Sequence, residues 1–530
     1  MNATAHQQDP GTGASRPPLW AAAATGLVAV AAALAAGHLV AALVDPFASP
    51  FLAVGNTAID LTPHPVKDFA IRTFGEDDKT VLLAGMAFAI TAFAALAGAL
   101  SRRSALPGTV LAAGLGAVGV AAVLARPTLG PIAVLAPLTS LVVGVVVFRW
   151  LHRLSRVDAG RGDPGTRSVD WQVPGLGRRR FLITSTAVVA AAGASAAAGQ
   201  LVGGRVDVEA SRRSIRLTPD VAAPPIPAGA DFAGDGTPAF ITPNADFYRV
   251  DTALSVPRLR ARDWRLRVHG MVDRELVLTY DDLLNRPLVE RTISLCCVSN
   301  EVGGPYISTT NFIGVSLSDV LAEAGVRPGA DQLATRSADG WTCGTPVEDI
   351  MAPGSDALLA LGMNGEPLPA EHGFPVRMVV PGLYGFVSAT KWLVDAELTT
   401  FADFDAYWVE RDWAQRAPIK TMSRIDRPKP FEQVPAGRFV AAGVAWAQHR
   451  GVDRVEVRAD GGPWQVATLG TEVNADTWRM WRVELDLPAG SHTLEVRATD
   501  RTGRTQTADR AEPIPDGASG WHTIVFSARP

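Results

Sequence analysis

The chain has 530 residues, of which 47% are hydrophobic and 19% are charged, and its formal net charge is −4 at pH 7. This length favours several domains, and the nearly balanced charge argues against a nucleic-acid partner, because proteins that bind nucleic acid usually present a basic surface. The three cysteines are too few for a disulfide framework, and none of them belongs to a CxxC pair of the kind that binds zinc.

Long uncharged segments dominate the N-terminal part of the chain. They cover residues 17–44, 80–101, 108–125, 127–148 and 181–204. Each has at least 18 residues, which at about 1.5 Å per residue is long enough for a helix to cross roughly 30 Å of hydrocarbon. The sequence therefore predicts a five-helix α transmembrane anchor over residues 1–204, embedded in membrane lipid.

The basic residues around these segments predict how the anchor is oriented. Eight arginines lie between residues 149 and 180, and Arg102 and Arg103 lie between the second and third segments. The region between the first two segments carries three basic residues against six acidic ones. Because positively charged loops stay in the cytoplasm, we expect the N-terminus inside and everything after the fifth segment on the extracytoplasmic side of the cytoplasmic membrane.

Three arginines precede the fifth segment, and the sequence Arg178-Arg179-Arg180-Phe181-Leu182 resembles a twin-arginine export signal. The alternative is a positive cluster that only flanks a helix, and the sequence leaves open whether the segment is cleaved. No haem motif is evident, because no segment carries paired histidines and the chain has no CxxCH.

Several elements are expected after the anchor. Residues 205–236 are rich in Pro, Ala and Gly, which predicts an extended, semi-rigid linker. Residues 264–272 alternate in polarity like an exposed-edge strand pair. Thr279 is expected to cap a short helix, and residues 315–325 predict an amphipathic helix that ends at Gly325.

Two adjacent thiols stand at the end of a β-rich run. Residues 292–295 lead into Cys296-Cys297, and polar residues and Gly303-Gly304 follow. This pattern predicts a strand that delivers a side chain into a loop, where sites are usually built. Two interpretations are open: the thiols are small buried residues, or one thiolate holds a soft transition metal.

A second segment agrees with the metal interpretation. It runs from His372-Gly373-Phe374-Pro375-Val376-Arg377 to Lys391-Trp392. With it, the chain from about residue 238 to the C-terminus resembles the sulfite oxidase superfamily of molybdenum–pterin oxidoreductases. In that family a cysteine in a Cys-x-x-Asn setting binds molybdenum. Cys297-Val298-Ser299-Asn300 fits and Cys296 does not, so the resemblance implies Cys297 as metal ligand and catalytic residue of a molybdenum–molybdopterin cofactor.

The resemblance also implies which residues contact the pterin and its phosphate. Arg377 can fork onto a phosphate with two hydrogen bonds, and Lys391 can add a point charge; the alternative is that both are surface charges beside a core strand. The Asn-then-Phe-Tyr pattern at residues 244–248 is similar to the branch of periplasmic methionine-sulfoxide reductases. The implied cofactor contacts, besides Cys297, are Asn244, Phe247, Tyr248, Ser337, His372, Arg377, Ser388, Thr390 and Lys391.

The C-terminal part of the chain has the sequence pattern of an all-β domain. Short alternating strands are expected at residues 438–446, 453–459, 464–469, 478–487 and 492–498, with turn residues between them. The pattern resembles an immunoglobulin-like dimerisation domain, which implies a homodimer. We therefore expect a mixed α+β sulfite-oxidase-fold molybdopterin domain over residues 237–415 and an immunoglobulin-like β-sandwich over residues 420–530.

Together these features predict a membrane-anchored molybdenum–pterin oxidoreductase. It would perform two-electron oxo transfer on a small or sulfur-containing substrate outside the membrane, with a separate electron carrier or quinone as electron partner. Pro243 stands where sulfite-oxidising members tend to have Arg, and Glu301-Val302 stands where animal enzymes have an Arg pair, so the substrate is left open. The alternatives are a methionine-sulfoxide-reductase-like repair enzyme and a non-catalytic membrane receptor with a β-sandwich binding domain.

Overall fold

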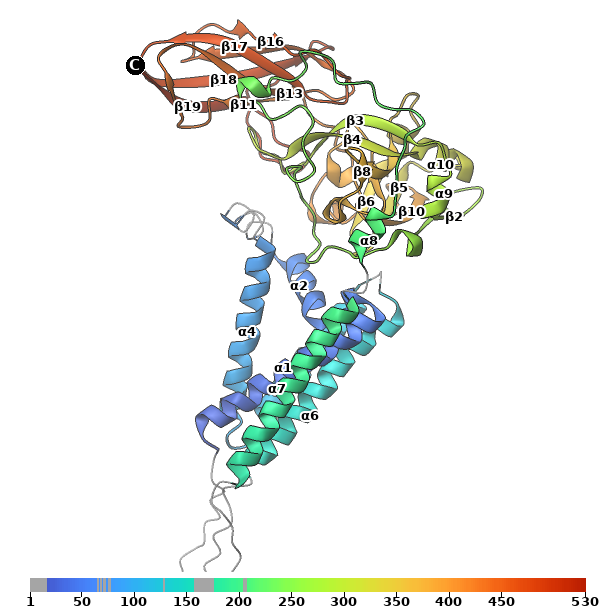
Figure 1. Ribbon diagram of the computed structural model, residues 1–530, viewed down its shortest axis with the longest axis vertical. Helices are drawn as coiled ribbons and strands as arrows, with labels where there is room; N and C mark the ends of the chain where they lie inside the picture. Colours follow the sequence, from blue (N-terminus) through green and yellow to red (C-terminus); the bar gives the residue numbers. More distant parts are fainter. Residues whose placement is uncertain are drawn as a thin grey trace, which may run out of the picture. The chain divides into compact units, whose positions relative to one another are not determined.

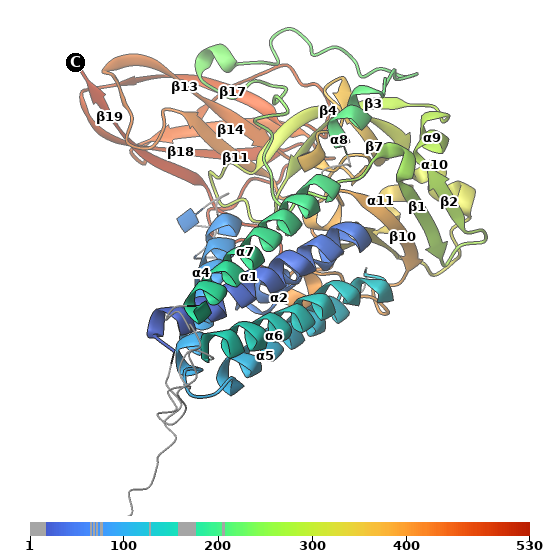
Figure 2. The same cartoon turned by 60° about the horizontal axis from the view of Figure 1, so that its bottom comes forward.

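The structure is a computed structural model that describes residues 17–63, 66, 69, 73–74, 78–126, 129–156, 176–203 and 207–530. The chain divides into two compact units, Met1–Arg205 and Val206–Pro530. Each unit is described by itself, and Figures 1 and 2 show the elements of both.

The first unit is helical. Its described helices are α1 (Leu19–Val44), α2 (Pro50–Leu61), α4 (Asp78–Leu100), α5 (Leu106–Leu124), α6 (Leu135–Arg156) and α7 (Leu176–Gly203). Helix α1 packs against α4, α6 and α7 (Figure 2). Small residues on α1 are buried at these contacts, among them Ala22, Ala29 and Ala41. Short side chains let the helix backbones approach closely, which is how helices associate in lipid.

Five helices in the described part of this unit are long and apolar enough to cross a membrane. They cover Leu19–Val44, Lys79–Leu100, Leu106–Leu124, Pro131–Arg156 and Arg179–Leu201. The fourth extends beyond its expected end at residue 148, because basic residues such as Arg153 and Arg156 are favourable in the last turn of a helix. The expected start of that span, at residues 127–128, lies outside the described residues. Helix α2 was not expected.

The second unit begins with two five-stranded sheets. The first has the order β2-β1-β10-β5-β6 and contains β1 (Arg265–Gly270), β2 (Leu276–Thr279), β5 (Gln332–Ser337), β6 (Thr342–Pro346) and β10 (Leu393–Thr399). The expectation of an edge position for residues 264–272 was wrong, because β1 pairs with β2 on one side and with β10 on the other. Alternating burial, with Leu266 and Val268 inside, marks a one-sided strand and does not say whether it lies at an edge.

The second sheet carries the cysteine strand. It contains β3 (Val289–Cys296), β4 (Ile307–Ser316), β7 (Leu358–Met363), β8 (Glu366–Pro367) and β9 (Arg377–Val379). Strand β3 pairs with β4 over its whole length, ending at Cys296 opposite Ile307. The expected strand at residues 292–296 is therefore confirmed.

One short helix precedes these strands, and three others connect them. They are α8 (Val208–Arg213), α9 (Tyr280–Leu284), α10 (Leu317–Ala324) and α11 (Val347–Met351). The expected cap on α9 is confirmed, since Thr279 and Asp282 form a capping box. The expected helix at residues 315–325 is also confirmed, with Ser316 as its N-cap and Gly325 after its end.

The described part of the expected linker packs on the second unit instead of forming a separate spacer. Asp220 N donates to Leu288 O at 2.7 Å, and Glu290 N donates to Val221 O at 2.8 Å beside β3. Phe232 is 8% exposed and belongs to the core of this unit. Burial of such apolar side chains stabilises the docked position.

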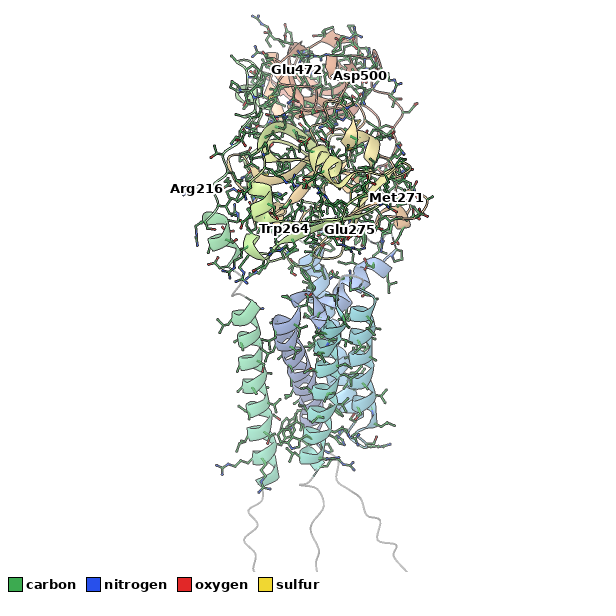
Figure 3. The ribbon with its side chains drawn as sticks, turned by 90° about the vertical axis from the view of Figure 1, so that its right-hand side faces the viewer. Arg216, Trp264, Met271, Glu275, Glu472 and Asp500 are labelled. Atoms are coloured by element: carbon green, nitrogen blue, oxygen red, sulfur yellow. The ribbon has the colours of Figure 1, made fainter. Side chains whose placement is uncertain are left out.

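The C-terminal part of the second unit is β-rich, as expected. One sheet has the order β11-β13-β17-β16, with β11 (Met422–Arg427), β13 (Gly437–Trp446), β17 (Arg479–Leu487) and β16 (Thr468–Leu469). The other has the order β12-β19-β18-β14-β15, with β12 (Gln433–Pro435), β19 (His522–Arg529), β18 (Gly490–Asp500), β14 (Val452–Ala459) and β15 (Gln465–Val466). Figure 3 labels Asp500 at the end of β18.

These two sheets share one hydrophobic core, which includes Phe439 and Trp481 from the first sheet and Val455 and Phe526 from the second. The single strand expected at residues 464–469 is in fact two short strands in different sheets, because the chain crosses between the sheets at the buried residue Ala467. Strands β11, β12 and β19 were not expected.

Candidate active site

Strand β3 delivers Cys297 into a closed loop. The Cys297 N–H donates to Tyr306 O at 3.0 Å, and Asn300 N donates to Cys297 O at 3.1 Å. The side-chain oxygen of Asn300 accepts from Tyr306 N at 2.8 Å, which ties the two ends of the loop together. Cys296 is 1% exposed and packs in the core, whereas Cys297 is 8% exposed. Adjacent residues of a strand point to opposite faces, which explains why the two thiols have different surroundings.

A metal at Cys297 would need most of its ligands from a cofactor. All three cysteines are free thiols. Within the part of the chain that the structure describes, no three His, Cys, Asp or Glu side chains are arranged to hold a metal ion. A single thiolate is a suitable ligand for a soft transition metal but does not complete a coordination shell alone.

A second group of predicted residues meets around His372, which ends a short 3-10 turn and is 3% exposed. Its Nε2 lies 3.2 Å from Asn244 O, and its ring meets the Phe247 ring edge-on at 5.4 Å. Arg377 Nη1 donates to His372 O at 3.3 Å. The structure therefore brings together residues 244–247 and 372–377, which are far apart in the sequence.

Gly373 fixes the distance between the two basic residues of this group. Its φ of +110° lies in the region that favours glycine. A β-carbon at this position would lie 3.0 Å from Arg377 Cβ and 3.1 Å from Lys391 Cα. Any side chain here would push Arg377 and Lys391 apart.

The electrostatics of this group are unusual because its cations are buried. Arg377 is 4% exposed, and its Nε has no hydrogen-bond partner among the described residues. Burial lowers the pKa of Arg377 to about 10 and that of Lys391 to about 8, although Asp251 at 2.8 Å opposes the shift of Lys391. Burial, with these two cations, lowers the pKa of His372 to about 3, so its imidazole is neutral at pH 7.

Tyr248 connects this group with the cysteine loop. Its ring stacks on Phe247 at 5.4 Å and meets Tyr306 edge-on at 6.2 Å. The short turn Gly385–Val387 is adjacent to both Tyr248 and Cys296, because a β-carbon at Gly385 would lie 3.8 Å from Tyr248 Oη and 3.7 Å from Cys296 O. Burial raises the pKa of Tyr248 well above its usual value, which keeps the phenol protonated as a hydrogen-bond donor.

The remaining predicted contacts differ in what they can offer to a ligand. Ser388 Oγ donates to Leu383 O and Tyr384 O at 3.1 Å, and the Thr390 hydroxyl bonds the Thr335 hydroxyl at 2.6 Å. These two hydroxyls, which are fully buried, already shape the protein. In contrast, Ser337 Oγ is buried and has no hydrogen-bond partner in the described structure.

The side chain of Asn244 is also engaged within the protein. Its amide nitrogen donates to Glu366 Oε1 at 2.6 Å, and its oxygen accepts from Asn364 Nδ2 at 2.9 Å. Asn244 therefore positions the loop, and its backbone oxygen is what reaches His372.

The C-terminal part of this unit contacts both the Cys297 loop and the turn at Pro381, which the sequence did not indicate. Arg424 Nη1 donates to Gly304 O at 2.9 Å, and the His522 ring packs directly on Gly303. His449 Nε2 lies 3.1 Å from Pro381 O. These partners are more than 60 residues apart in the sequence, and no local motif marks such contacts.

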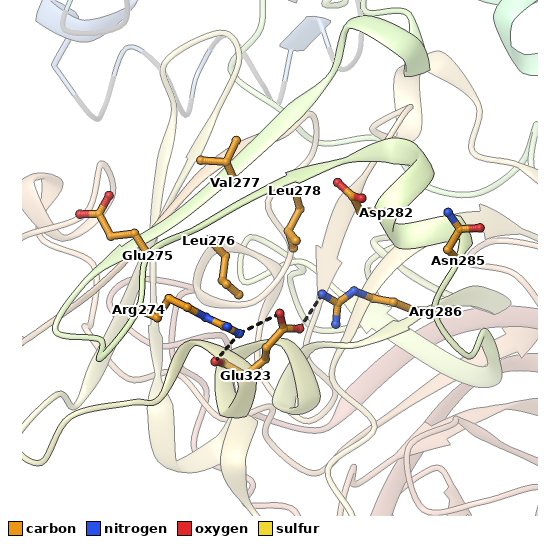
Figure 4. Close-up of a pocket in the computed structure, with 9 residues that line it drawn as sticks. All are labelled: Arg274, Glu275, Leu276, Val277, Leu278, Asp282, Asn285, Arg286 and Glu323. Carbon is orange, nitrogen blue, oxygen red and sulfur yellow. Dashed lines mark hydrogen bonds and ion pairs between the residues drawn. The ribbon is translucent and has the colours of Figure 1, made fainter.

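A surface depression of about 580 Å³ lies elsewhere in this unit (Figure 4). It is lined by residues of β2, α9 and α10, and Arg274 and Arg286 both bond Glu323 across it. None of the predicted cofactor residues lines it, so it is separate from the site.

Comparison with known proteins identifies the family of this site. Residues 253–408 match the family described as oxidoreductase molybdopterin binding domain, a range that includes Cys297, His372, Arg377 and Lys391. Mitochondrial sulfite oxidase of Homo sapiens is 33% identical over 348 residues, covering 56% of this chain and 63% of that protein. Sulfite oxidase of Gallus gallus is 31% identical over 324 residues, covering 52% of this chain and 70% of that protein. This chain belongs to the sulfite oxidase superfamily.

The resemblance seen in the sequence is thereby confirmed. Among solved structures, the sulfane dehydrogenase SoxCD from Paracoccus pantotrophus is 26% identical, with a TM-score of 0.48, covering 55% of this chain and 84% of that chain. The chain spans 63% of the length of the human superfamily member. Asn244, Phe247 and Tyr248 lie before residue 253 in the sequence, outside the range matched to the molybdopterin-binding family. The fold places them beside that range, since Asn244 and Phe247 contact His372 and Tyr248 stacks on Phe247.

Proposed function

We propose that this chain is a membrane-anchored molybdenum–pterin oxidoreductase that performs two-electron oxo transfer on a small or sulfur-containing substrate outside the cytoplasmic membrane. The observation that carries the proposal is the buried guanidinium of Arg377, whose Nε has no partner in the described structure. It belongs to the same site as the loop of Cys297, through Phe247 and Tyr248.

The residues present fit the cofactor. A buried charge without a partner is costly, and Arg377 forms no ion pair with a described carboxylate, unlike Lys391 with Asp251. The phosphate of a pterin cofactor would supply the missing anion. Cys297 would be the thiolate ligand of molybdenum.

The bound molybdenum–pterin group would supply the two-electron chemistry. The protein then has to bind and orient it. Arg377 and Lys391 would hold the phosphate, while the neutral His372, fixed by Phe247 and Asn244 O, would hydrogen-bond the pterin. Phe247, Ser388, Thr390 and the Asn244 side chain would shape the site. The protonated phenol of Tyr248 can donate a hydrogen bond to a substrate oxygen near the cysteine loop.

The organisation of the rest of the chain is part of the proposal. Residues 1–204 would form the membrane anchor, with the N-terminus inside, the catalytic domain outside, and the segment at Arg178–Leu182 acting as a twin-arginine signal. Residues 237–415 would be the molybdopterin domain, and residues 420–530 an immunoglobulin-like domain that makes a homodimer. Five apolar helices and two sheets with a shared core support this arrangement. Electrons would pass to or from a separate carrier or quinone.

Elemental analysis tests the proposal. The full chain is expressed in a host that makes the cofactor, solubilised in detergent, and assayed for molybdenum and pterin beside Cys297→Ser and Cys296→Ser. We expect about one molybdenum per chain in the wild type and in Cys296→Ser, and loss of metal and activity in Cys297→Ser. Wild-type protein without molybdenum would favour a membrane receptor instead, and an active Cys297→Ser would refute the ligand assignment.

A further inference from the structure

Asp251 and Lys391 form a buried ion pair within the site. Lys391 Nζ lies 2.8 Å from Asp251 Oδ2, and the side chains of Lys391 and Asp251 are 11% and 6% exposed. Asp251 lies before the matched molybdopterin-binding range, and the sequence motifs did not single it out. Desolvation of two buried charges can outweigh their mutual attraction, so a buried ion pair does little for stability by itself. The pair therefore points to a role in the site.

Lys391 is held by two segments of the chain and keeps one N–H for a ligand. Its ammonium has three N–H groups. One donates to Asp251 Oδ2 at 2.8 Å and another to Glu371 O at 3.2 Å, and among the described residues no acceptor bonds the third. A β-carbon at Gly373 would touch both Lys391 and Arg377, so these two cations lie side by side. Because Arg377 Nε also lacks a partner in the described chain, both residues offer donors to the same anion.

The charge of Lys391 depends on Asp251. Burial lowers the pKa of Lys391 to about 8; the Asp251 carboxylate opposes this effect, and the neighbouring cations Arg377 and Arg249 add to it. Arg249 Nε in turn donates to Asp251 Oδ2 at 2.9 Å. Lys391 is a base whose pKa is lowered in the folded protein, so its ammonium is lost as the pH rises through about 8. Without the Asp251 carboxylate, this loss would occur nearer to neutral pH.

The other ionisable groups that face Lys391 do not replace Asp251. Burial raises the pKa of the Asp339 carboxyl and of the Cys297 thiol, and it lowers the pKa of His372 to about 3. In the described part of the chain, none of these three side chains forms a hydrogen bond or an ion pair with Lys391. Asp251 is therefore the carboxylate that is bonded to the ammonium of Lys391.

We infer that Asp251 is a positioning residue of the cofactor site, which keeps the Lys391 ammonium charged and directs one of its N–H groups to the phosphate of the pterin cofactor. This inference rests on the proposed function. Asp251 would not touch the cofactor, and its own negative charge repels the phosphate. Removing that charge should therefore have opposite effects at two pH values. Where Lys391 stays protonated, the repulsion is relieved; where Lys391 becomes neutral, the phosphate loses a cation.

The test follows the rate at which the loaded full chain, solubilised in detergent, loses its pterin. Protein is incubated between about pH 6 and pH 9, and the pterin that remains bound is measured by fluorescence after release, beside the molybdenum content. Asp251→Asn removes the charge and keeps the shape of the side chain, and Lys391→Met gives the behaviour of a site without this cation. Asp356→Asn is the matched control, because it removes a carboxylate that pairs with Arg291 Nε at 2.6 Å, away from the cofactor residues.

We expect Asp251→Asn to retain pterin as long as the wild type at about pH 6, and to lose it about tenfold faster than the wild type at about pH 8, because a charged hydrogen bond is then missing. At about pH 8 its rate should equal that of Lys391→Met. The wild type and Asp356→Asn should retain pterin at both pH values, because the bound phosphate raises the pKa of Lys391. Asp251→Glu, which keeps a carboxylate, should behave as the wild type does.

Two results would overturn the inference. One is a rate of pterin loss from Asp251→Asn that differs from the wild-type rate by the same factor at every pH, or not at all, since a structural residue would behave in this way. The other is an Asp251→Glu variant that loses pterin with the pH dependence of Asp251→Asn. Wild-type protein without molybdenum and pterin would instead overturn the proposed function itself.

Discussion

Replacing Arg377 with methionine should have opposite effects on the cofactor-free and the loaded protein. Burial lowers the pKa of Arg377 from its usual value to about 10, so keeping the charge in the cofactor-free protein costs about 3 kcal/mol at about 1.4 kcal/mol per pKa unit. Arg377 stays protonated below about pH 10, and because this is a base whose folded-state pKa is lowered, its charge destabilises the folded protein relative to the unfolded chain over that whole range. Methionine removes that cost.

The variant also loses two weaker interactions. They are the contact of the guanidinium with the Phe312 ring at 5.6 Å and the hydrogen bond to His372 O at 3.3 Å, together worth about 1 kcal/mol. We therefore expect Arg377→Met to stabilise the cofactor-free protein by about 2 kcal/mol, or roughly 4 °C in Tm. In the loaded protein it should remove a charged contact worth about 1.5–3 kcal/mol and lower cofactor occupancy at least about tenfold.

The assay is thermal unfolding of the detergent-solubilised full chain, purified with and without the cofactor, together with its molybdenum content. Arg450→Met is the control, because Arg450 Nε donates to Asp500 at 2.9 Å and its removal leaves a buried carboxylate without its cation. That variant should destabilise both forms by about 2–3 kcal/mol. If Arg377→Met lowered the Tm of the cofactor-free and of the loaded protein by similar amounts, Arg377 would be a structural residue and the reasoning would be wrong.

Three further predictions concern the framework of the site. Burial opposes ionisation of Asp500, but hydrogen bonds from Thr502 and its neighbours outweigh this effect and lower the pKa of Asp500 to about 2. Asp500→Asn should therefore lower the free energy of unfolding by about 2 kcal/mol at pH 7, as measured in urea. The difference in unfolding free energy between the variant and the wild type should shrink as the pH falls from 4 to 2. The hydrogen bond to Asp476 raises the pKa of His449. His449→Gln should therefore lower the Tm most below pH 6, and the loss should disappear as the pH rises above the raised pKa. A series of Tm values measured against pH checks this. Gly373→Ala should lower the free energy of unfolding by about 1–3 kcal/mol, because Gly373 has a φ of +110°. It should also reduce the amount of bound pterin, which is measured by fluorescence after release. Full pterin content would show that the spacing of Arg377 and Lys391 does not matter.

Local patterns allowed much of this fold to be predicted. The cysteine strand, the capped helix at Thr279 and the helix that ends at Gly325 depend on neighbours in the sequence. The position of β1 inside its sheet could not be predicted, because it depends on β10, which is distant in the sequence. Strand β19 does have an alternating pattern, with Ile524 and Phe526 inside, and this signal was missed.

The predicted site residues came from motifs, and motifs do not say which polar groups remain available. Ser388 and Thr390 lie where the resemblance put them, but their hydroxyls bond within the protein. Asp251 belongs to no motif, and its ion pair with Lys391 becomes visible only when its surroundings are known. Arg424 and His522 reach the cysteine loop from the C-terminal sheets, and only tertiary contacts reveal this.

The support of the cysteine loop by β11 and β19 has a consequence for how the protein matures. Cys297 is synthesised long before His522, so during translation the loop exists without the residues that hold Gly303 and Gly304. A pocket able to retain a prosthetic group would be finished only after β19 has left the ribosome. Loading would then be a late, post-translational event, and a nascent chain truncated before β19 should emerge without metal.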